Sequence, residues 1–140
     1  MIEDPDLSLR ILTHFAQPDV PYPSNLDFVD QLVPAFADVS PATLAYHVKC
    51  CMDAGLLDGD CRVETSFNHA EIVVGWMHGL TVTGGDYVRQ ATAPGFWQKA
   101  LDRVRAVGVR PTTAVLVQVL ARITAEALGP QSEPVPPTAG

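Results

Sequence analysis

Apolar residues recur at helical spacing near the start of the chain. Leu7, Ile11 and Phe15 are four residues apart, which is the period of one face of an amphipathic helix. The pattern predicts a first helix over residues 6–17, with Asp4 or Asp6 capping its positive end. The proline-rich stretch 18–23 should end this helix, because proline removes a backbone donor and restricts the residue before it.

A second helix is predicted after that turn, capped by Ser24 or Asn25 and ended or kinked by Pro34. Its apolar positions are Leu26, Val29, Leu32 and Val33. A third helix should begin at Ser40-Pro41, since serine is a favoured N-cap and proline suits the first helical position. Gly55 is well placed to end it in a left-handed conformation. Three short helices, the third clearly capped, indicate a helix-turn-helix.

The periodicity changes from helical to alternating after Gly55. Residues 58–60 (Asp-Gly-Asp) predict a turn, and residues 61–64 alternate apolar and polar side chains as a strand does. Residues 71–77 are rich in β-branched and aromatic side chains, and residues 80–82 are also strand-like. Two or three strands after the third helix are what the wing of a winged helix requires.

Three further helices are predicted towards the C-terminus. The first starts with Thr83 as its cap and Asp86 in a capping-box position. The second carries Trp97, Leu101 and Val104 on one face and ends at Gly108, and the last runs from Thr112 to Leu128. The apolar stripe of the last helix is Leu116, Leu120, Ile123 and Ala127, widened by Val115 and Val119. Residues 130–140 hold four prolines and no pattern, which predicts a disordered tail.

The predicted fold class is therefore α+β, mainly α: a winged helix-turn-helix with a C-terminal helical extension, forming a single domain over residues 1–129. Its length of 140 residues suits one domain. No stretch reaches the length of a membrane helix, and the acidic start lacks the order of a signal peptide, so a cytoplasmic protein with no membrane contact is expected. Three clustered cysteines favour reduced thiols.

The net charge of −7 is unevenly distributed. Residues 1–61 hold ten acidic side chains against Arg10 and Lys49, and residues 62–140 hold six against seven basic ones. Because proteins that bind DNA usually present a basic face, this asymmetry weakens a DNA-binding interpretation.

Several short stretches of the sequence resemble a known family. The segment 45–57, which reads Ala-Tyr-His-Val-Lys and later Asp-Ala-Gly-Leu-Leu, resembles the recognition-helix segment of a family of small bacterial and prophage proteins known only as domain of unknown function 2513. Residues 79–88 and the Phe-Trp-Gln-Lys at 96–99 follow in the family's order, so the resemblance covers about residues 40–128. It implies a winged-helix fold and a phage or mobile-element setting, and it assigns no catalytic residue. Cys50, Cys51 and Val82 depart from its pattern.

The sequence favours neither a metal site, nor a phosphate loop, nor a catalytic nucleophile. His47 and Cys51 share a helix face, and Cys61 with His69 could complete a metal site, but the spacing matches no known zinc pattern and buried thiols are common in cores. No phosphate loop is present, and Gly84-Gly85 is better explained by close packing where a strand meets a helix. No local signature supports a nucleophile, so no metal, no cofactor and no catalytic residue is predicted, and the chain is expected to be non-enzymatic.

Two binding functions remain open. In the first, which the predicted fold favours, the chain is a DNA-binding transcriptional regulator of phage type, dimeric through the Thr112 to Leu128 helix. In the second, it is an acidic protein-interaction module, such as a phage-encoded inhibitor of a host defence or transcription component. The residues expected to meet DNA or the partner are Ser40, Thr43, Tyr46, His47, Lys49 and Arg62. His47 could either face that partner or pack inside with its ring bonded to backbone.

Overall fold

The computed structural model describes residues 1–17 and 26–129. The molecule is α+β and mainly helical, with one small three-stranded antiparallel sheet. Its elements in chain order are α1 (Pro5–Phe15), β1 (Leu26–Asp27), η1 (Phe28–Leu32), α2 (Val33–Ala35), α3 (Pro41–Asp53), β2 (Leu57–Ser66), β3 (His69–Leu80), α4 (Val82–Thr92), α5 (Phe96–Ala106) and α6 (Thr113–Leu128). The predicted turn at 18–23, the predicted caps Ser24 and Asn25 and the predicted tail 130–140 lie outside the described residues.

The predicted N-cap of α1 and both predicted ends of α3 are confirmed, whereas α1 ends at Phe15, two residues before the predicted end. The Asp4 carboxylate accepts a hydrogen bond from the Asp6 amide at 3.0 Å, and the Ser40 hydroxyl accepts one from the Thr43 amide at 3.2 Å. Gly55 has φ +76°, and the amide of Leu56 reaches back to the Cys51 carbonyl. This is a Schellman ending, which satisfies carbonyls that the last turn of a helix leaves unpaired.

The predicted second helix is wrong at its start. Leu26 and Asp27 form a short strand that pairs with Met77 and Trp76 of β3, and the Asp27 side chain caps the helical turn that follows. Val29, predicted as a core position, is 65% exposed, whereas Phe28 is buried. Pairing with a strand fifty residues away decided the conformation of Leu26 and Asp27, which helical periodicity alone misassigned.

Strands β2 and β3 form one long hairpin, and the predicted turn at 58–60 is wrong. Those residues belong to β2, where shifts in register mark a bulge between Asp58 and Cys61. Gly59 is required there, because a Cβ at this position would lie 2.5 Å from the Trp76 carbonyl oxygen. The true turn is Phe67-Asn68, and residues 80–82 make no third strand of their own, since Thr81 already caps α4.

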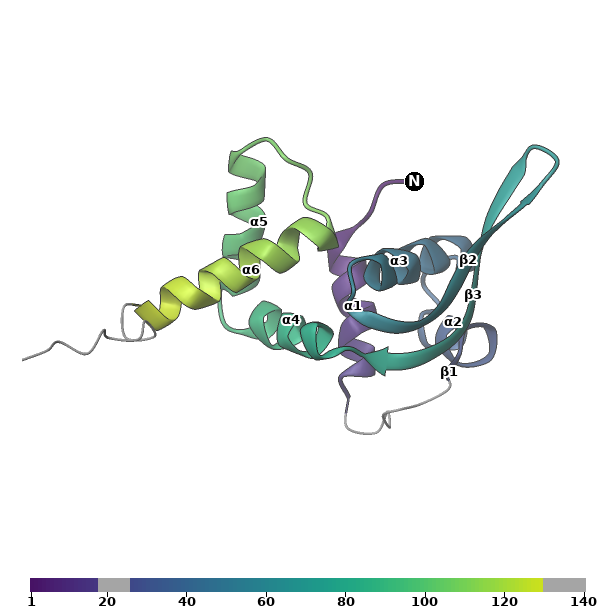
Figure 1. Cartoon of the computed structure of the whole chain (residues 1–140), viewed down its shortest axis with the longest axis horizontal. Helices are drawn as coiled ribbons and strands as arrows, with labels where there is room; N and C mark the ends of the chain where they lie inside the picture. Colours follow the sequence, from purple (N-terminus) through teal and green to yellow (C-terminus); the bar gives the residue numbers. More distant parts are fainter. Residues whose placement is uncertain (18–25, 130–140) are drawn as a thin grey trace, which may run out of the picture.

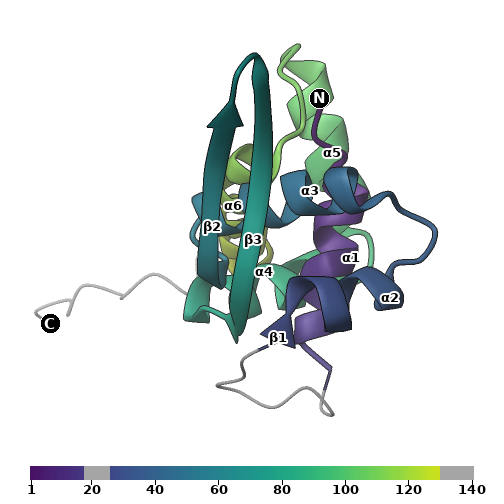
Figure 2. The same ribbon diagram turned by 90° about the vertical axis from the view of Figure 1, so that its right-hand side faces the viewer.

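The outer half of this hairpin extends beyond the helical body (Figures 1 and 2). Every residue from Arg62 to Glu71 is exposed, whereas Leu57, Val74 and Met77 near its base are buried. The alternation at 61–64 therefore predicted the strand correctly but not a buried face, because Val63 is 51% exposed. The hairpin is thus a two-stranded ribbon whose base packs on α3 and whose tip is free on both faces.

Helix α4 begins two residues earlier than predicted. Thr81, not Thr83, is the N-cap: its hydroxyl oxygen accepts from the Gly84 amide at 3.0 Å. Asp86 is therefore not in a capping-box position and pairs with Arg89 instead. The prediction of close packing is confirmed at Gly84, where a Cβ would lie 2.0 Å from the Leu56 carbonyl oxygen.

One apolar core joins all the longer helices to the base of the sheet. Helix α1 crosses the centre of the molecule between α3 and α4, and helices α5 and α6 lie together at the end away from the hairpin (Figure 1). Leu116, Leu120 and Ile123 of α6 are fully buried as predicted, whereas Ala127 is exposed. None of the helices in the described part of the chain has the length and apolar character that crossing a bilayer requires.

Candidate functional site

The start of α3 presents two hydroxyl groups that are already bonded to each other. The Ser40 hydroxyl donates to the Thr43 hydroxyl at 2.8 Å and also accepts from the Thr43 amide. Ser40 is exposed and Thr43 half-buried. Both side chains therefore serve first as the cap of α3. Only the lone pairs of their hydroxyl oxygens that the cap does not use remain available to a partner.

His47 lies inside the protein, the second of the two alternatives for this residue. It is 1% exposed, its Nε2 accepts the Asp4 amide at 2.8 Å, and its Nδ1 lies 2.7 Å from the Thr43 carbonyl oxygen. Because Nε2 accepts, the ring proton sits on Nδ1 and is donated to that carbonyl. His47 thus joins α3 to the segment before α1 and does not reach the surface.

Tyr46 stands beside His47 on the outer side of α3. The two rings meet edge to face, with centroids 5.3 Å apart and planes at 83°. The phenol is half-buried, and burial raises its pKa, with a smaller contribution from Cys50 nearby. Tyr46 therefore offers a neutral aromatic surface held in a fixed orientation.

The two basic residues predicted to contact DNA are both paired with acids of their own element. Lys49 pairs with Asp53 one turn later on α3, which raises the lysine pKa, and Arg62 pairs with Glu64 at 2.8 Å on β2. Across α3, β2 and β3 there are five acidic side chains: Asp53, Asp58, Asp60, Glu64 and Glu71. Acidic side chains therefore outnumber Lys49 and Arg62 on these three elements.

A groove of about 730 Å³ separates the first half of α3 from the first half of β3. Its α3 wall includes Ser40, Ala45 and Tyr46, and its opposite wall runs from His69 to Val74 of β3. Met1 and Val29 line its end and are 70% and 65% exposed. No lysine or arginine lines the described walls, and Glu71 is their acidic side chain. The groove thus brings Ser40 and Tyr46 together, and leaves Lys49 and Arg62 outside.

Phe67 occupies the tip of the hairpin and is fully exposed. Its φ of +54° is unusual for an aromatic residue, which adopts the left-handed region only at a cost in free energy. An aromatic side chain held at the end of a projecting ribbon is available for contact with a partner. The sequence held a signal for this turn, because Phe67 precedes Asn68 in a short polar stretch. The position of the hairpin tip could be assigned only after the register of β2 and β3 was known.

Of the three cysteines, Cys51 is buried and Cys50 and Cys61 are half-buried. Burial raises the pKa of the Cys50 thiol to about 11 and raises the pKa of Cys51 further, and the Cys51 thiol contacts the Ser8 carbonyl oxygen. Thiols held protonated in this way are poor nucleophiles and poor ligands. Within residues 1–17 and 26–129, no three His, Cys, Asp or Glu side chains are grouped so that they could hold a metal ion.

A buried acidic residue that the sequence did not single out supports the whole site. Glu3 accepts from the Ser8 hydroxyl at 2.7 Å and from both the amide and the hydroxyl of Thr113. It therefore joins the first residues of the chain to the start of α6, next to the Asp4–His47 bond. The only sequence signal was an acidic side chain just before the α1 cap, which equally describes a solvated residue.

These observations define a mainly helical protein that presents one helix, one groove and one projecting hairpin on the same side. The chain belongs to the family described as "Hypothetical protein (DUF2513)", whose profile matches residues 4–110. This confirms the family resemblance and extends it to the N-terminal helix, while α6 lies beyond the match. Neither a curated protein nor a solved structure matches the chain at the threshold applied.

Proposed function

We propose that this protein is a non-enzymatic interaction module of the winged-helix type. The support is the order of its elements: a helix, a strand, two helical segments and then a two-stranded hairpin, with the first strand added to the edge of the hairpin. In this interpretation α3 corresponds to the recognition helix, and the free half of the hairpin corresponds to the wing. Fold alone does not identify the partner, so the partner is argued from the surface chemistry.

The partner we propose is a protein segment with an apolar side chain flanked by lysine or arginine. The observation that carries this proposal is the apolar groove between α3 and β3, on a face whose two cations are already paired with carboxylates. Apolar side chains gain free energy by entering such a groove, and a basic flank complements Glu71 and the surrounding acids. Phe67 at the hairpin tip would add an aromatic contact at the rim.

A DNA duplex fits the same face poorly. Affinity for DNA comes mainly from neutralising several phosphates with lysine and arginine, which releases counterions. Here Lys49 and Arg62 are already paired with Asp53 and Glu64, which reduces the positive charge they offer to phosphates. The DNA-binding regulator is therefore the second hypothesis, and its support is the order of the elements alone.

Photo-crosslinking from the groove tests the proposal. A benzoylphenylalanine at Ile72, which lines the groove, should crosslink one defined protein in cells that produce this chain, and the same label at Arg105 on α5 should not. Ala42→Arg, at an exposed position that lines the groove, places a cation there and should remove the crosslink, whereas Thr65→Arg on the free hairpin should not. Equal crosslinking from both labelled positions would contradict the proposal.

A parallel titration addresses DNA directly. Fluorescence anisotropy with a labelled duplex at low salt should show no saturable binding in the micromolar range. Binding that weakens steeply with salt and is lost in the Lys49→Ala, Arg62→Ala double variant would instead identify a DNA-binding regulator.

A further inference from the structure

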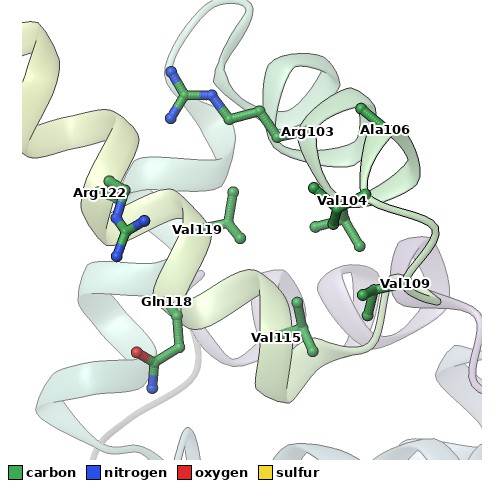
Figure 3. Close-up of a pocket in the computed structure, with 9 residues that line it drawn as sticks. Arg103, Val104, Ala106, Val109, Val115, Gln118, Val119 and Arg122 are labelled. Atoms are coloured by element: carbon green, nitrogen blue, oxygen red, sulfur yellow. The ribbon is translucent and has the colours of Figure 1, made fainter.

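A second hollow lies between α5 and α6, at the end of the molecule away from the hairpin (Figures 1 and 3). Its volume is about 510 Å³, within the range of roughly 300–1,000 Å³ typical of small-molecule sites. Its apolar lining is Val104, Ala106, Val107, Val109, Val115 and Val119. Val104 is buried at the base, Val115 and Val119 are half-buried, and Val107 and Val109 are exposed, so the hollow is a trough open to solvent.

Two arginines lie on one side of this trough. Figure 3 shows Arg103 and Arg122 on the side opposite Val109, with the valines between them. Arg103 pairs with Glu126 at 2.6 Å, whereas Arg122 forms no ion pair with any carboxylate in the described ranges. The trough thus has an aliphatic part and a cationic end. At the cationic end, the Arg122 guanidinium forms no ion pair within the described residues.

The positive charge around the arginine end of the trough exceeds what the Glu126 carboxylate neutralises. Arg103 lowers the pKa of Glu126 mainly through its hydrogen bond, and the positive charges of Arg103, Lys99 and Arg122 lower it further. Residues 96–129 contain five basic and two acidic side chains, in contrast to the acidic body. A second carboxylate is therefore complementary to this end, and a cationic head group is not.

We propose that the trough between α5 and α6 binds a small amphipathic carboxylate, with its aliphatic tail along the valines and its head on Arg122 and Arg103. A planar guanidinium binds a carboxylate through two parallel hydrogen bonds, which orients the ligand as well as holding it. A phosphate of nucleic acid would gain nothing from the aliphatic lining. A symmetric second copy on this face would set the arginines of one copy against those of the other, which is unfavourable.

Nuclear magnetic resonance with decanoate as the probe tests this site. Decanoate should cause saturable amide shifts at Val104, Val115 and Val119, with little change along α3 or the hairpin. Decanol, which has the same chain and no charge, should bind about tenfold more weakly, because it loses the charged hydrogen bonds. Arg122→Gln should weaken decanoate by a similar factor, and Arg105→Gln, on an exposed arginine outside the trough, should leave binding unchanged.

A variant that fills the trough gives an independent measurement. Val119→Trp should abolish the decanoate shifts. A melting curve of this variant shows whether it still folds. If Val119→Trp does not fold, the surface variant Arg122→Gln provides the test. Equal binding of decanol and decanoate, or equal binding by Arg122→Gln and the unaltered protein, would overturn the proposal. So would a dimer in sedimentation that covers the trough and excludes decanoate, or an absence of saturable shifts at millimolar decanoate.

Discussion

Single residues hold the end of α3 against the start of α4. The Leu56 amide donates to the Cys51 carbonyl, and the Leu56 carbonyl accepts from the Thr81 amide, each at 3.0 Å. The Thr81 hydroxyl adds a bond to the Gly55 carbonyl at 2.6 Å. The chain at Leu56 therefore passes so close to α4 that only glycine fits at position 84.

Replacing Gly84 with alanine should destabilise the protein by about 1–3 kcal/mol. The added Cβ would overlap the Leu56 carbonyl group, and the backbone there is fixed by one hydrogen bond at the Leu56 carbonyl and one at its amide, so α4 would have to shift. Thermal unfolding followed by circular dichroism measures the loss as a lower melting temperature.

The neighbouring glycine provides the control. A Cβ at Gly85 meets nothing closer than the Arg89 guanidinium at 3.6 Å, an ordinary contact with a flexible side chain. Gly85→Ala should therefore stabilise the helix by about 0.5–1 kcal/mol, because alanine loses less conformational entropy than glycine on folding. Effects of the same sign at both positions would contradict this account.

At the scale of elements, the residues that lead into α1 and its first turn contact three helices that are far apart in sequence. Glu3 binds Thr113 at the start of α6, the Asp4 amide binds His47 in α3, and Asp6 accepts from the Trp97 indole of α5 at 2.8 Å. A buried carboxylate is tolerated only when hydrogen-bond donors surround it, and here two hydroxyls and an amide do so.

Removing the Glu3 carboxylate should cost about 2–4 kcal/mol of unfolding free energy. In Glu3→Ala the Thr113 amide and the Ser8 hydroxyl lose their acceptor while remaining buried, and each such group costs about 1–3 kcal/mol. Urea denaturation measures the change. An unaltered slope of the unfolding free energy against urea concentration shows that Glu3→Ala and the unaltered protein unfold in the same transition.

Two comparisons make the Glu3 result specific. Glu3→Gln keeps one acceptor oxygen and should lose less stability than Glu3→Ala. Glu71→Ala, on the free half of the hairpin, should change stability by no more than about 0.5 kcal/mol. If Glu3→Ala matched Glu71→Ala, the buried network would not hold α6 in place.

At the scale of the whole molecule, the two ends differ in charge and in surface. The end with α3 and the hairpin is acidic and has the apolar groove, whereas the end with α5 and α6 has a cationic rim around an aliphatic trough. The family match ends at residue 110, yet α6 contributes part of the common core. The molecule is therefore expected to need α6 for folding.

A chain shortened to residues 1–110 should lose cooperative unfolding. It lacks Leu116, Leu120 and Ile123, and burying three such side chains contributes roughly 5 kcal/mol or more, which is comparable with the total stability of a domain. Amide resonances spread over a narrow range would show the loss of fixed packing. A chain ending at Gly129 keeps α6 and is the matched control, and a cooperative melt of the 1–110 chain would contradict the prediction.

The strongest sequence predictions rested on local chemistry. Ser40-Pro41 and Gly55 marked both ends of α3 because caps depend on the backbone within one turn. The same holds for the buried stripe of α6, where periodicity selects the inward face. The family was also readable, because its segments keep their order along the chain.

The errors arose where distant residues decide the outcome. Leu26 and Asp27 became a strand because β3 offers them hydrogen bonds, and Thr81 replaced Thr83 as a cap because β3 continues to Leu80. The candidate site changed for a local reason: Lys49 and Arg62 each pair with an acid of the same element, four and two residues further along the chain. The four-residue spacing of Lys49 and Asp53 on one helix was visible in the sequence, but only the side-chain conformations show that both pairs form.

The sequence by itself determined the longer helices, the caps of α1 and α3, the excess of acid and the family, since each follows from neighbouring residues or from composition. Only the tertiary structure decided that His47 is buried, that Glu3 binds α6, and that a groove lies beside Tyr46 and a trough between α5 and α6. Those features require residues up to 110 positions apart to meet. Their positions follow from how the elements pack, because burial and hydrogen bonding are satisfied over the whole molecule and not within one segment.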